Sequence, residues 1–260
     1  MVSLLTVNIG AASLARAKRQ LEWLRGRPEE VLILSETSAG DGTAYILDHF
    51  RSLGRTVVHT AQKGDRGVAI VSKVPGVSLS LGEAVTLPHR AVALRIETEP
   101  SVTVVGVYIP SRDATPEKIS RKRLFLGAFV EALLKLPSFD RDRLVVGGDY
   151  NVIHRLHKPS YRQFMPFEYE FLDSLAAMGL HDAHHVLHDP EVPQHSWVGR
   201  TGDGYRYDYF HVGHELASEV VESEYLHETR LEHGLTDHSA VRLRLGMRVV
   251  AGEDDPMTLF

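Results

Sequence analysis

Residues 144–151 read LVVGGDYN, an apolar run followed by two glycines, an acid, an aromatic residue and an amide. The apolar run predicts a buried strand, and the polar residues lie where that strand ends. Gly147 and Gly148 leave room for another backbone or a ligand to approach closely. Asp149 and Asn151 face the same side if the strand geometry continues, where they suit a phosphate and an attacking water. The alternative is a strand that runs into an Asx turn, because both residues favour turns.

Two earlier predicted strands also end in polar side chains. Residues 3–7 lead to Asn8, and residues 31–34 lead to Glu36. Between them, residues 12–25 carry leucines at helical spacing and predict an amphipathic helix. Asn8 could be only a cap or turn residue. Glu36 is harder to explain in that way, because a carboxylate at the end of a buried strand needs a cation.

The middle of the chain has the pattern of β-structure. Residues 54–60 and 68–72 flank the turn-forming sequence KGDRG and predict a hairpin. Residues 90–97 and 102–109 predict two long strands, the second of which ends near Tyr108. By itself, a tyrosine in that position is ordinarily a β-former with its hydroxyl at the sheet edge.

A basic segment follows this strand. Residues 112–123 contain five basic residues and two acids. The segment could contact phosphates, or it could be the solvated start of the amphipathic helix predicted over residues 124–136.

Four histidines lie close together in the second half of the chain. On a helix, His181, His184, His185 and His188 would share one face, which suggests a zinc site. The nearby Pro190 favours a short surface turn instead, and structural zinc sites usually take their ligands from separated segments.

Two further polar pairs lie late in the chain. Residues 205–212 predict a strand with Arg206 and Asp208 on one face, which a salt-bridged strand pair would also explain. Asp237 and His238 precede the last predicted strand. Their adjacency could be a surface coincidence, or both could return to the same sheet edge.

Composition limits the chemistry. The chain has no cysteine, so any metal must be held by oxygen or imidazole ligands, and oxygen ligands favour Mg²⁺ or Mn²⁺. The net charge of −5 argues against a surface coated for non-specific nucleic-acid binding, although a local basic strip is still possible.

The 260 residues predict one domain, residues 1–247, with a disordered tail at residues 248–260. The N-terminus lacks the basic segment and apolar core of a signal peptide, and no stretch of about 18 apolar residues is found. We therefore expect a cytoplasmic monomer that does not bind membranes.

In their order along the chain, these motifs resemble the endonuclease/exonuclease/phosphatase superfamily over essentially residues 3–245, and most closely exonuclease III and the apurinic endonucleases. GGDYN resembles the family's GD-aromatic-N motif, GYRYDYF its R-I-D-Y segment and TDH its S-D-H motif. LSET, GDRGVAIVSK and FMPFEYEFLDSLAAMGLHDA resemble further segments of the nuclease branch. Two features depart from it. TVNIG stands where W-N-V-N-G is common, and the tract after Tyr108 and the loop before Tyr205 look shorter than in enzymes that grip duplex DNA.

The resemblance implies an α/β fold of four layers, in which two mostly antiparallel sheets are flanked by helices, as in DNase I. It also implies hydrolysis of phosphate esters with Mg²⁺ or Mn²⁺. The implied metal ligands are Glu36, Asn8 and Asp237. The implied catalytic residues are Tyr108, Asp149, Asn151, Asp208 and His238.

Each of these residues has an implied role. Asp149, aligned by Asn151, would take a proton from water, and His238, oriented by Asp237, would donate to a phosphate oxygen. Tyr108 would bind the phosphate or assist the leaving oxygen, and Asp208 would support His238 or the leaving group.

The substrate implied is DNA, cut as by exonuclease III or an apurinic endonuclease. The substrate-binding residues implied are Arg112, Lys118, Lys122 and Arg123 at backbone phosphates, with Trp197, Arg200 and Arg206 near the scissile nucleotide. Trp197 could equally be a core residue. The acidic net charge and short loops favour the alternative, a phosphatase or phosphodiesterase that acts on a small-molecule or lipid phosphate ester.

Two other possibilities concern binding. A non-catalytic binding module is disfavoured, because a decayed site would not keep carboxylates at buried strand ends. The terminal DDPMTLF, residues 254–260, loosely resembles peptides that dock on the bacterial sliding clamp.

Overall fold

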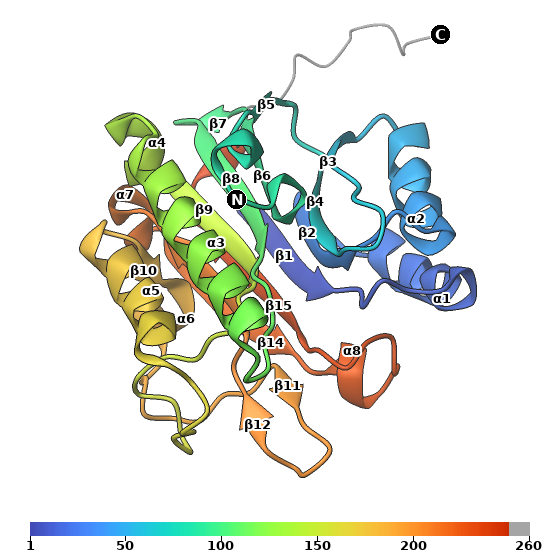
Figure 1. Ribbon diagram of the computed structural model, residues 1–260. Helices are drawn as coiled ribbons and strands as arrows, with labels where there is room; N and C mark the ends of the chain where they lie inside the picture. The colour runs from blue at the N-terminus through green and yellow to red at the C-terminus, as the bar shows by residue number, and fades with distance from the viewer. Residues whose placement is uncertain (250–260) are drawn as a thin grey trace, which may run out of the picture.

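The computed structural model describes residues 1–249, which form a four-layer α/β sandwich (Figure 1). Two six-stranded sheets pack face to face, and helices cover the outer face of each sheet. The predicted fold class is confirmed. The clamp-like sequence at residues 254–260 lies outside the described residues.

The first sheet is built around a parallel pair of strands. Its order is β14 (Val220–Leu226), β15 (Ala240–Leu245), β1 (Val2–Asn8), β2 (Val31–Thr37), β4 (Gly67–Ser72) and β3 (Thr56–His59). β1 and β2 are parallel, and every other neighbouring pair is antiparallel. β1 and β2 therefore end at the same edge of the sheet.

The second sheet repeats this arrangement. Its order is β10 (His181–Asp182), β13 (Asp208–Val212), β9 (Leu144–Asp149), β8 (Val102–Tyr108), β6 (Ala91–Ile96) and β5 (Gly76–Leu79). Here β8 and β9 are the parallel pair. Two short ribbons complete the strands, namely β7 (Thr98–Glu99) with β16 (Arg248–Val249), and β11 (Trp197–Val198) with β12 (Gly204–Tyr205).

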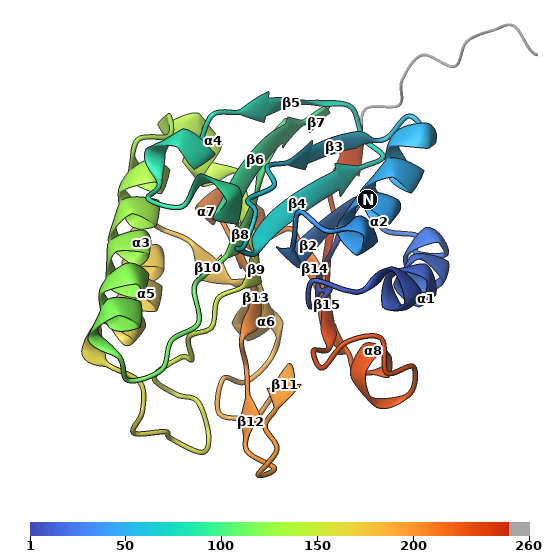
Figure 2. The ribbon, with the colours of Figure 1, turned by 45° about the vertical axis from the view of Figure 1, so that its right-hand side comes forward.

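The long helices form the two outer layers, as Figure 2 shows. The first sheet is covered by α1 (Leu14–Arg25) and α2 (Asp41–Ser52), and the second by α3 (Pro116–Leu134) and α5 (Pro166–Ala177). The short helices are α4 (Ser138–Asp142), α6 (Ala183–Leu187), α7 (His214–Ala217), α8 (Glu228–Leu231), η1 (Gly82–Ala84) and η2 (Pro88–Arg90). Among the described residues, no helix has both the length and the hydropathy that a membrane crossing requires.

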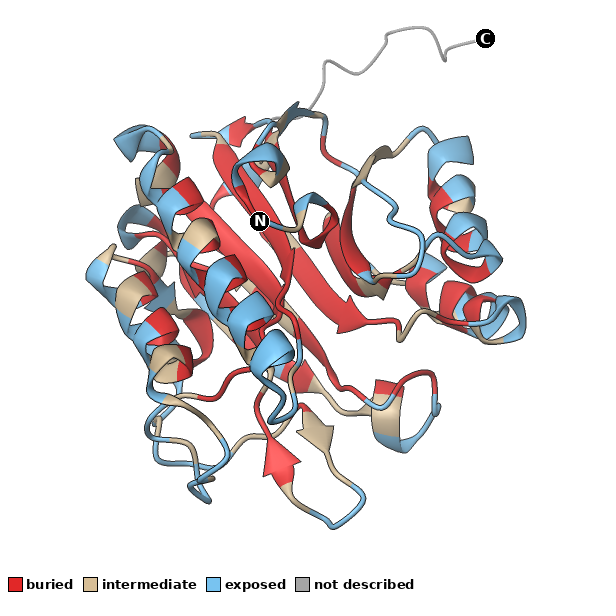
Figure 3. Cartoon of the chain, in the orientation of Figure 1, coloured by how far each residue is buried: buried red, intermediate tan, exposed pale blue. Residues whose placement is uncertain are grey.

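Buried strand residues fill the space between the sheets (Figure 3). Ile33 and Ile70 of the first sheet share a core with Val104 and Phe210 of the second. A Cβ atom on Gly147 would lie 2.4 Å from the ring of Phe210. Phe210 belongs to the neighbouring strand of the same sheet, and the same atom would lie 2.8 Å from Ile33 of the facing sheet. The first glycine of LVVGGDYN is therefore required by packing within its sheet and between the sheets.

Most predicted elements are present, with adjusted ends. The first helix begins at Leu14, because Ser13 caps it by accepting a hydrogen bond from the Arg16 N–H. The hairpin of β3 and β4 is confirmed. The strand predicted over residues 205–212 is interrupted, since β12 ends at Tyr205 and β13 begins at Asp208.

The histidine segment forms no long helix. His181 lies in β10, and α6 is a five-residue helix. His184 and His188 both hydrogen-bond the Ser223 carbonyl, through Nδ1 at 3.2 Å and Nε2 at 3.1 Å. The segment is therefore a short strand and a short helix and not the surface turn expected there, and both rings bond to the backbone of β14.

Candidate active site

The parallel strand pairs bring four predicted side chains to one edge of the sandwich. Asn8 ends β1, Glu36 lies near the end of β2, Tyr108 ends β8 and Asp149 ends β9. β13 is antiparallel to β9 and starts at this edge, with Asp208 directly opposite Asp149. The topology alone therefore explains why residues far apart in sequence form one site.

Asn8 links two of the carboxylates. Its Nδ2 donates to Asp149 Oδ2 at 2.9 Å and to Glu36 Oε1 at 3.1 Å. Its Oδ1 accepts the Gly10 N–H at 2.8 Å, which fixes the orientation of the amide. In the structure the Asn8 amide therefore orients both carboxylates. Its role as a metal ligand through Oδ1 stays a prediction.

Glu36 adopts an unusual backbone conformation. Its φ is +54°, and the pairing of β2 with β4 shifts register between Ser35 and Thr37. Such strain persists where surrounding structure imposes it, often at functional sites. Glu36 Oε1 accepts the Tyr108 hydroxyl at 3.2 Å, and Oε2 pairs with the guanidinium of Arg66.

His238 is paired with Asp208. Its Nδ1 lies 2.7 Å from Asp208 Oδ2, and both side chains are buried. Burial lowers the pKa of His238, but the charge and hydrogen bond of Asp208 outweigh burial and raise the pKa to about 10. The predicted orientation of His238 by Asp237 is wrong. Asp237 Oδ2 instead accepts the Trp197 Nε1–H at 2.9 Å.

Asp149 ends β9 and is buried at the active edge. It is 1% exposed, and its Oδ1 accepts the Asn151 N–H at 3.0 Å. Burial, followed by the charge of Asp208, raises the pKa of Asp149 well above the usual range of a carboxyl. A raised pKa suits a group that must take a proton near neutral pH.

The donor set fits a hard divalent cation. Glu36 and Asp237 present carboxylates to the same pocket, and oxygen ligands are those that Mg²⁺ and Mn²⁺ prefer. The contact with Arg66 already places a positive charge against Glu36. Asp208 Oδ1 is buried and accepts no hydrogen bond from the residues that the structure describes. Asp149, Asp208 and His238 also offer ligand atoms within 4.8 Å of one another.

Two residues of the predicted basic strip support the site from behind. Lys122 is 1% exposed, and its Nζ lies 2.7 Å from Glu168 Oε1 and donates to the Asn151 carbonyl at 2.6 Å. Arg112 donates to the other oxygen of Glu168. The expected phosphate contact of Lys122 is therefore corrected, because its ammonium group is already buried in an ion pair.

Arg206 is corrected for the same reason. It is 4% exposed and makes two hydrogen bonds to Asp182, at 2.6 and 2.7 Å. Its Nε donates to the Tyr225 hydroxyl, which donates to the Asp208 carbonyl at 2.7 Å. Arg206 thus braces the backbone of Asp208 and cannot reach a substrate.

The other predicted substrate contacts lie on the surface around the site. Lys118 pairs with Asp113 at 2.7 Å, and the guanidinium of Arg123 lies 4.8 Å from the centre of the Phe167 ring. Arg200 is exposed in the turn between β11 and β12. Trp197 lines the pocket and is not a core residue.

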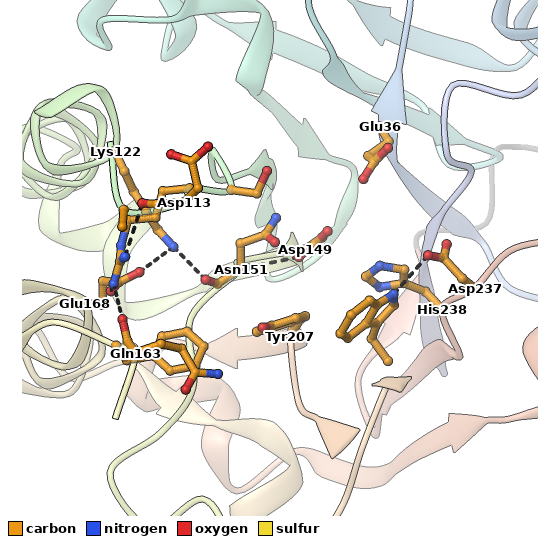
Figure 4. Close-up of a pocket in the computed structure, with 15 residues that line it drawn as sticks. Glu36, Asp113, Lys122, Asp149, Asn151, Gln163, Glu168, Tyr207, Asp237 and His238 are labelled. Carbon is orange, nitrogen blue, oxygen red and sulfur yellow. Dashed lines mark hydrogen bonds and ion pairs between the residues drawn. The ribbon is translucent and has the colours of Figure 1, made fainter. Parts of the chain in front are cut away.

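A pocket of about 560 Å³ opens directly beside these groups (Figure 4). Glu36, Asp149 and His238 lie along one side of it. Its further lining includes Asp113, Gln163, Phe164, Trp197 and Tyr207. No functional role was predicted for Gln163, Phe164 or Tyr207, and Arg66 was assigned only to a turn. A signal existed for Arg66, since the turn KGDRG precedes a strand of the same sheet as Glu36.

Comparisons with known proteins agree with this geometry. A sequence model described as the Endonuclease/Exonuclease/phosphatase family matches residues 5–218. Among curated proteins, none matches the chain significantly.

Several solved structures share the fold. A variant of the 3′ phosphatase NExo from Neisseria, solved with a product DNA hairpin, has a TM-score of 0.79 at 22% identity, covering 94% of this chain and 99% of that one. An AP endonuclease from Archaeoglobus fulgidus has a TM-score of 0.78 at 19% identity, with the same coverages. The AP endonuclease LMAP from Leishmania major has a TM-score of 0.74 at 17% identity, covering 94% and 87%.

Proposed function

The chain belongs to the endonuclease/exonuclease/phosphatase family, and on this basis we propose that it is a divalent-metal-dependent hydrolase of phosphodiester bonds in DNA. The observation that carries the proposal is the cluster at the sheet edge. Glu36, Asp149 and His238 line one pocket that also holds the aromatic residues Trp197 and Tyr207. Acids and a protonated imidazole suit ester hydrolysis, and aromatic rings suit a nucleotide.

Asp149 is the proposed proton acceptor. The oxygen of a water molecule forms a bond to phosphorus while the bond from phosphorus to the leaving oxygen breaks, and Asp149 takes the proton of that water. The N–H of Asn151 and the amide of Asn8 hold the carboxylate in position. Its raised pKa makes the carboxylate a stronger base than an ordinary aspartate.

His238 and Tyr108 are the proposed hydrogen-bond donors to the phosphate. Asp208 binds Nδ1 of His238 and keeps the ring protonated at neutral pH, so Nε2 can donate to a phosphate oxygen as negative charge builds up. Burial and the charge of Glu36 raise the pKa of Tyr108, so its hydroxyl keeps its proton and can donate to the phosphate or the leaving oxygen.

Glu36 and Asp237 would hold the Mg²⁺ or Mn²⁺ ion, which when bound supplies Lewis-acid stabilisation of the phosphate oxygens. Arg66 pairs with Oε2 of Glu36, and its side chain is 46% accessible to solvent.

A small-molecule or lipid phosphate ester is the second candidate substrate. The observation that favours it is charge. The net charge is −5, and the basic residues Lys118 and Arg121 near the pocket are each paired with an aspartate. A duplex DNA binder would be expected to present more free cations.

A substrate panel tests the proposal. The purified chain is incubated with Mg²⁺ and with an abasic duplex, a blunt duplex, single strands and small phosphate esters, and each reaction is repeated with EDTA. Mg²⁺-dependent DNA cleavage, with substrate affinity that falls steeply as salt is added, supports the DNA proposal. Turnover of the small esters alone, with little salt dependence, would replace it with the second candidate.

A further inference from the structure

Tyr207 departs from the sequence motif that surrounds it. The family segment R-I-D-Y has isoleucine where this chain has the tyrosine of R-Y-D-Y. Tyr207 lies in the link between β12 and β13, is partly buried and lines the pocket (Figure 4). Within residues 1–249 its hydroxyl has no hydrogen-bond partner, although the hydroxyls of its neighbours Tyr205 and Tyr209 each have one.

The position of Tyr207 is fixed by its backbone. Its N–H donates to Ser196 Oγ at 2.9 Å, and its carbonyl accepts the Tyr150 N–H at 2.8 Å. The ring of Tyr205 stacks on Tyr207 with centroids 5.2 Å apart and an interplanar angle of 15°. Tyr205 is buried and does not line the pocket, so it supports the ring from behind.

Two more rings complete an aromatic wall. Trp197 lies 5.9 Å from Tyr207 and Phe164 lies 6.3 Å from it, centroid to centroid. Both Trp197 and Phe164 line the pocket. Trp197 is also hydrogen-bonded to Asp237, so the wall is joined to the catalytic edge.

We infer that this pocket receives a nucleotide with its base, and that Tyr207 is the residue that stacks on the base next to the scissile phosphate. The inference rests on the proposed function and deepens it, because it selects a base-bearing nucleotide over an abasic residue. The pocket volume of about 560 Å³ is within the usual range of small-molecule sites, about 300 to 1,000 Å³. A bare deoxyribose has no planar face with which to use three aromatic rings.

The expected size of the effect follows from base stacking. Stacking of one base on an aromatic side chain changes affinity by roughly 5- to 150-fold. An aliphatic side chain at position 207 would leave the base without this partner, whereas phenylalanine would preserve the ring.

The test compares two DNA duplexes that share one scissile phosphate. One ends in an unpaired 3′-terminal deoxyadenosine, and the other ends in a tetrahydrofuran residue that lacks only the base. We expect the wild type to have a kcat/KM about tenfold higher on the adenine end. Tyr207→Leu should lose this preference and Tyr207→Phe should keep it. Tyr45→Leu, which alters an exposed tyrosine of α2, is the matched control.

Binding is measured separately, by calorimetry with dAMP and with deoxyribose 5-phosphate in the presence of Mg²⁺. The wild type should bind dAMP more tightly, and Tyr207→Leu should bind both about equally. If no DNA end is cleaved but this binding difference is found, the proposed function fails and the role of Tyr207 stands. Equal binding of the two ligands by the wild type, or a base preference unchanged in Tyr207→Leu, overturns the inference.

Discussion

Two buried carboxylates lie side by side on paired strands at the edge that holds the candidate active site. Asp149 and Asp208 are opposite in register, and they are 1% and 0% exposed. Asp208 shares a hydrogen bond with His238, whereas Asp149 is held by the neutral amides of Asn8 and Asn151. Burial and the nearby charge of Asp208 therefore disfavour the ionised form of Asp149 in the folded state.

Asp149→Asn should lower activity without lowering stability. Loss of the proton acceptor is expected to lower turnover by about 10² to 10⁴. Because asparagine is neutral beside Asp208 without having to bind a proton, the melting temperature should stay the same or rise. Initial rates with Mg²⁺ and thermal melts measure the two effects, with Asp48→Asn on the exposed face of α2 as control. A variant with wild-type turnover would contradict the assignment.

The sequence was informative about which residues meet and less informative about how each is bonded. Polar residues after buried strands predicted the meeting of Glu36, Tyr108 and Asp149, since parallel strands end together. It assigned the orientation of His238 to Asp237 and offered Asp208 only as a support for His238 or the leaving group, whereas Asp208 is the residue that bonds to Nδ1 of His238. The hydrophobic period and the position in a strand predict on which face of a sheet a side chain lies. A hydrogen bond between side chains of two sheets also depends on how far apart the sheets lie, which no local sequence pattern specifies.

The packing of helix α3 against α5 explains why the substrate contact predicted for Lys122 is wrong. Lys122 belongs to α3, whose start is strongly basic, but the helix turns this lysine toward α5 and the ion pair with Glu168. Glu168 also accepts the Met165 N–H and so caps α5. The pair thus ties two helices to the backbone of Asn151, where φ is +51°.

Lys122→Met should destabilise the protein strongly. It leaves Glu168 buried beside only Arg112, and breaking a buried ion pair typically costs about 3 to 5 kcal/mol. Adding Glu168→Gln should recover most of this loss, because glutamine is neutral and can still accept the Met165 N–H. Urea unfolding of the single and double variants measures the coupling. If the double variant is no more stable than Lys122→Met, the charge is not the cause.

Gly148 limits the approach of β9 to β8. Its φ is +145°, and a Cβ atom there would lie 1.9 Å from the Val107 carbonyl oxygen. Gly148→Ala should therefore cost about 3 kcal/mol or more in unfolding free energy. Gly127→Ala is the matched control, since position 127 is exposed in α3 with open space around it, and should gain about 0.5 to 1 kcal/mol. Equal stabilities of the two variants would show that the strands can separate.

Among the elements without a prediction are α2 and β14. α2 contains Gly42, where a Cβ atom would lie 2.0 Å from the Ala12 carbonyl oxygen. A glycine inside a helix lowers the helix propensity of the local sequence. Glycine is needed here because of the close tertiary contact with Ala12. β14 is an edge strand whose Glu222 and Glu224 pair with arginines of β15. The alternation of acidic residues along β14 predicts a strand only once its pairing with β15 is known.

At the scale of the molecule, one end of the sandwich is catalytic and the flank behind it is rich in histidine. Three buried or partly buried imidazoles, His184, His185 and His211, surround the guanidinium of Arg206. Burial and the charge of Arg206 together lower the pKa of each to about 4, although the charge of Asp182 partly opposes them. The folded chain therefore holds these rings neutral near pH 5, when an unfolded chain would protonate them.

This difference predicts acid destabilisation between about pH 6.5 and pH 4. In that range the unfolded state binds protons that the folded state does not, so the free energy of unfolding falls as pH falls, by about 3 kcal/mol for His211 alone. Asp149 acts in the opposite sense over the same range, because its raised pKa lets the folded state bind a proton. The comparison must therefore be made between variants.

His211→Phe should flatten this pH dependence. Phenylalanine cannot titrate, and it can keep the stacking on Tyr150, whose ring centroid lies 5.5 Å from that of His211. Urea unfolding at pH 7 and pH 5 gives the change in stability for each protein. We expect that change to be smaller in His211→Phe than in the wild type, and to be unaltered in His233→Gln, where the histidine is exposed. If His211→Phe loses as much stability as the wild type, His211 is protonated in the folded chain and Asp182, not burial, governs its charge.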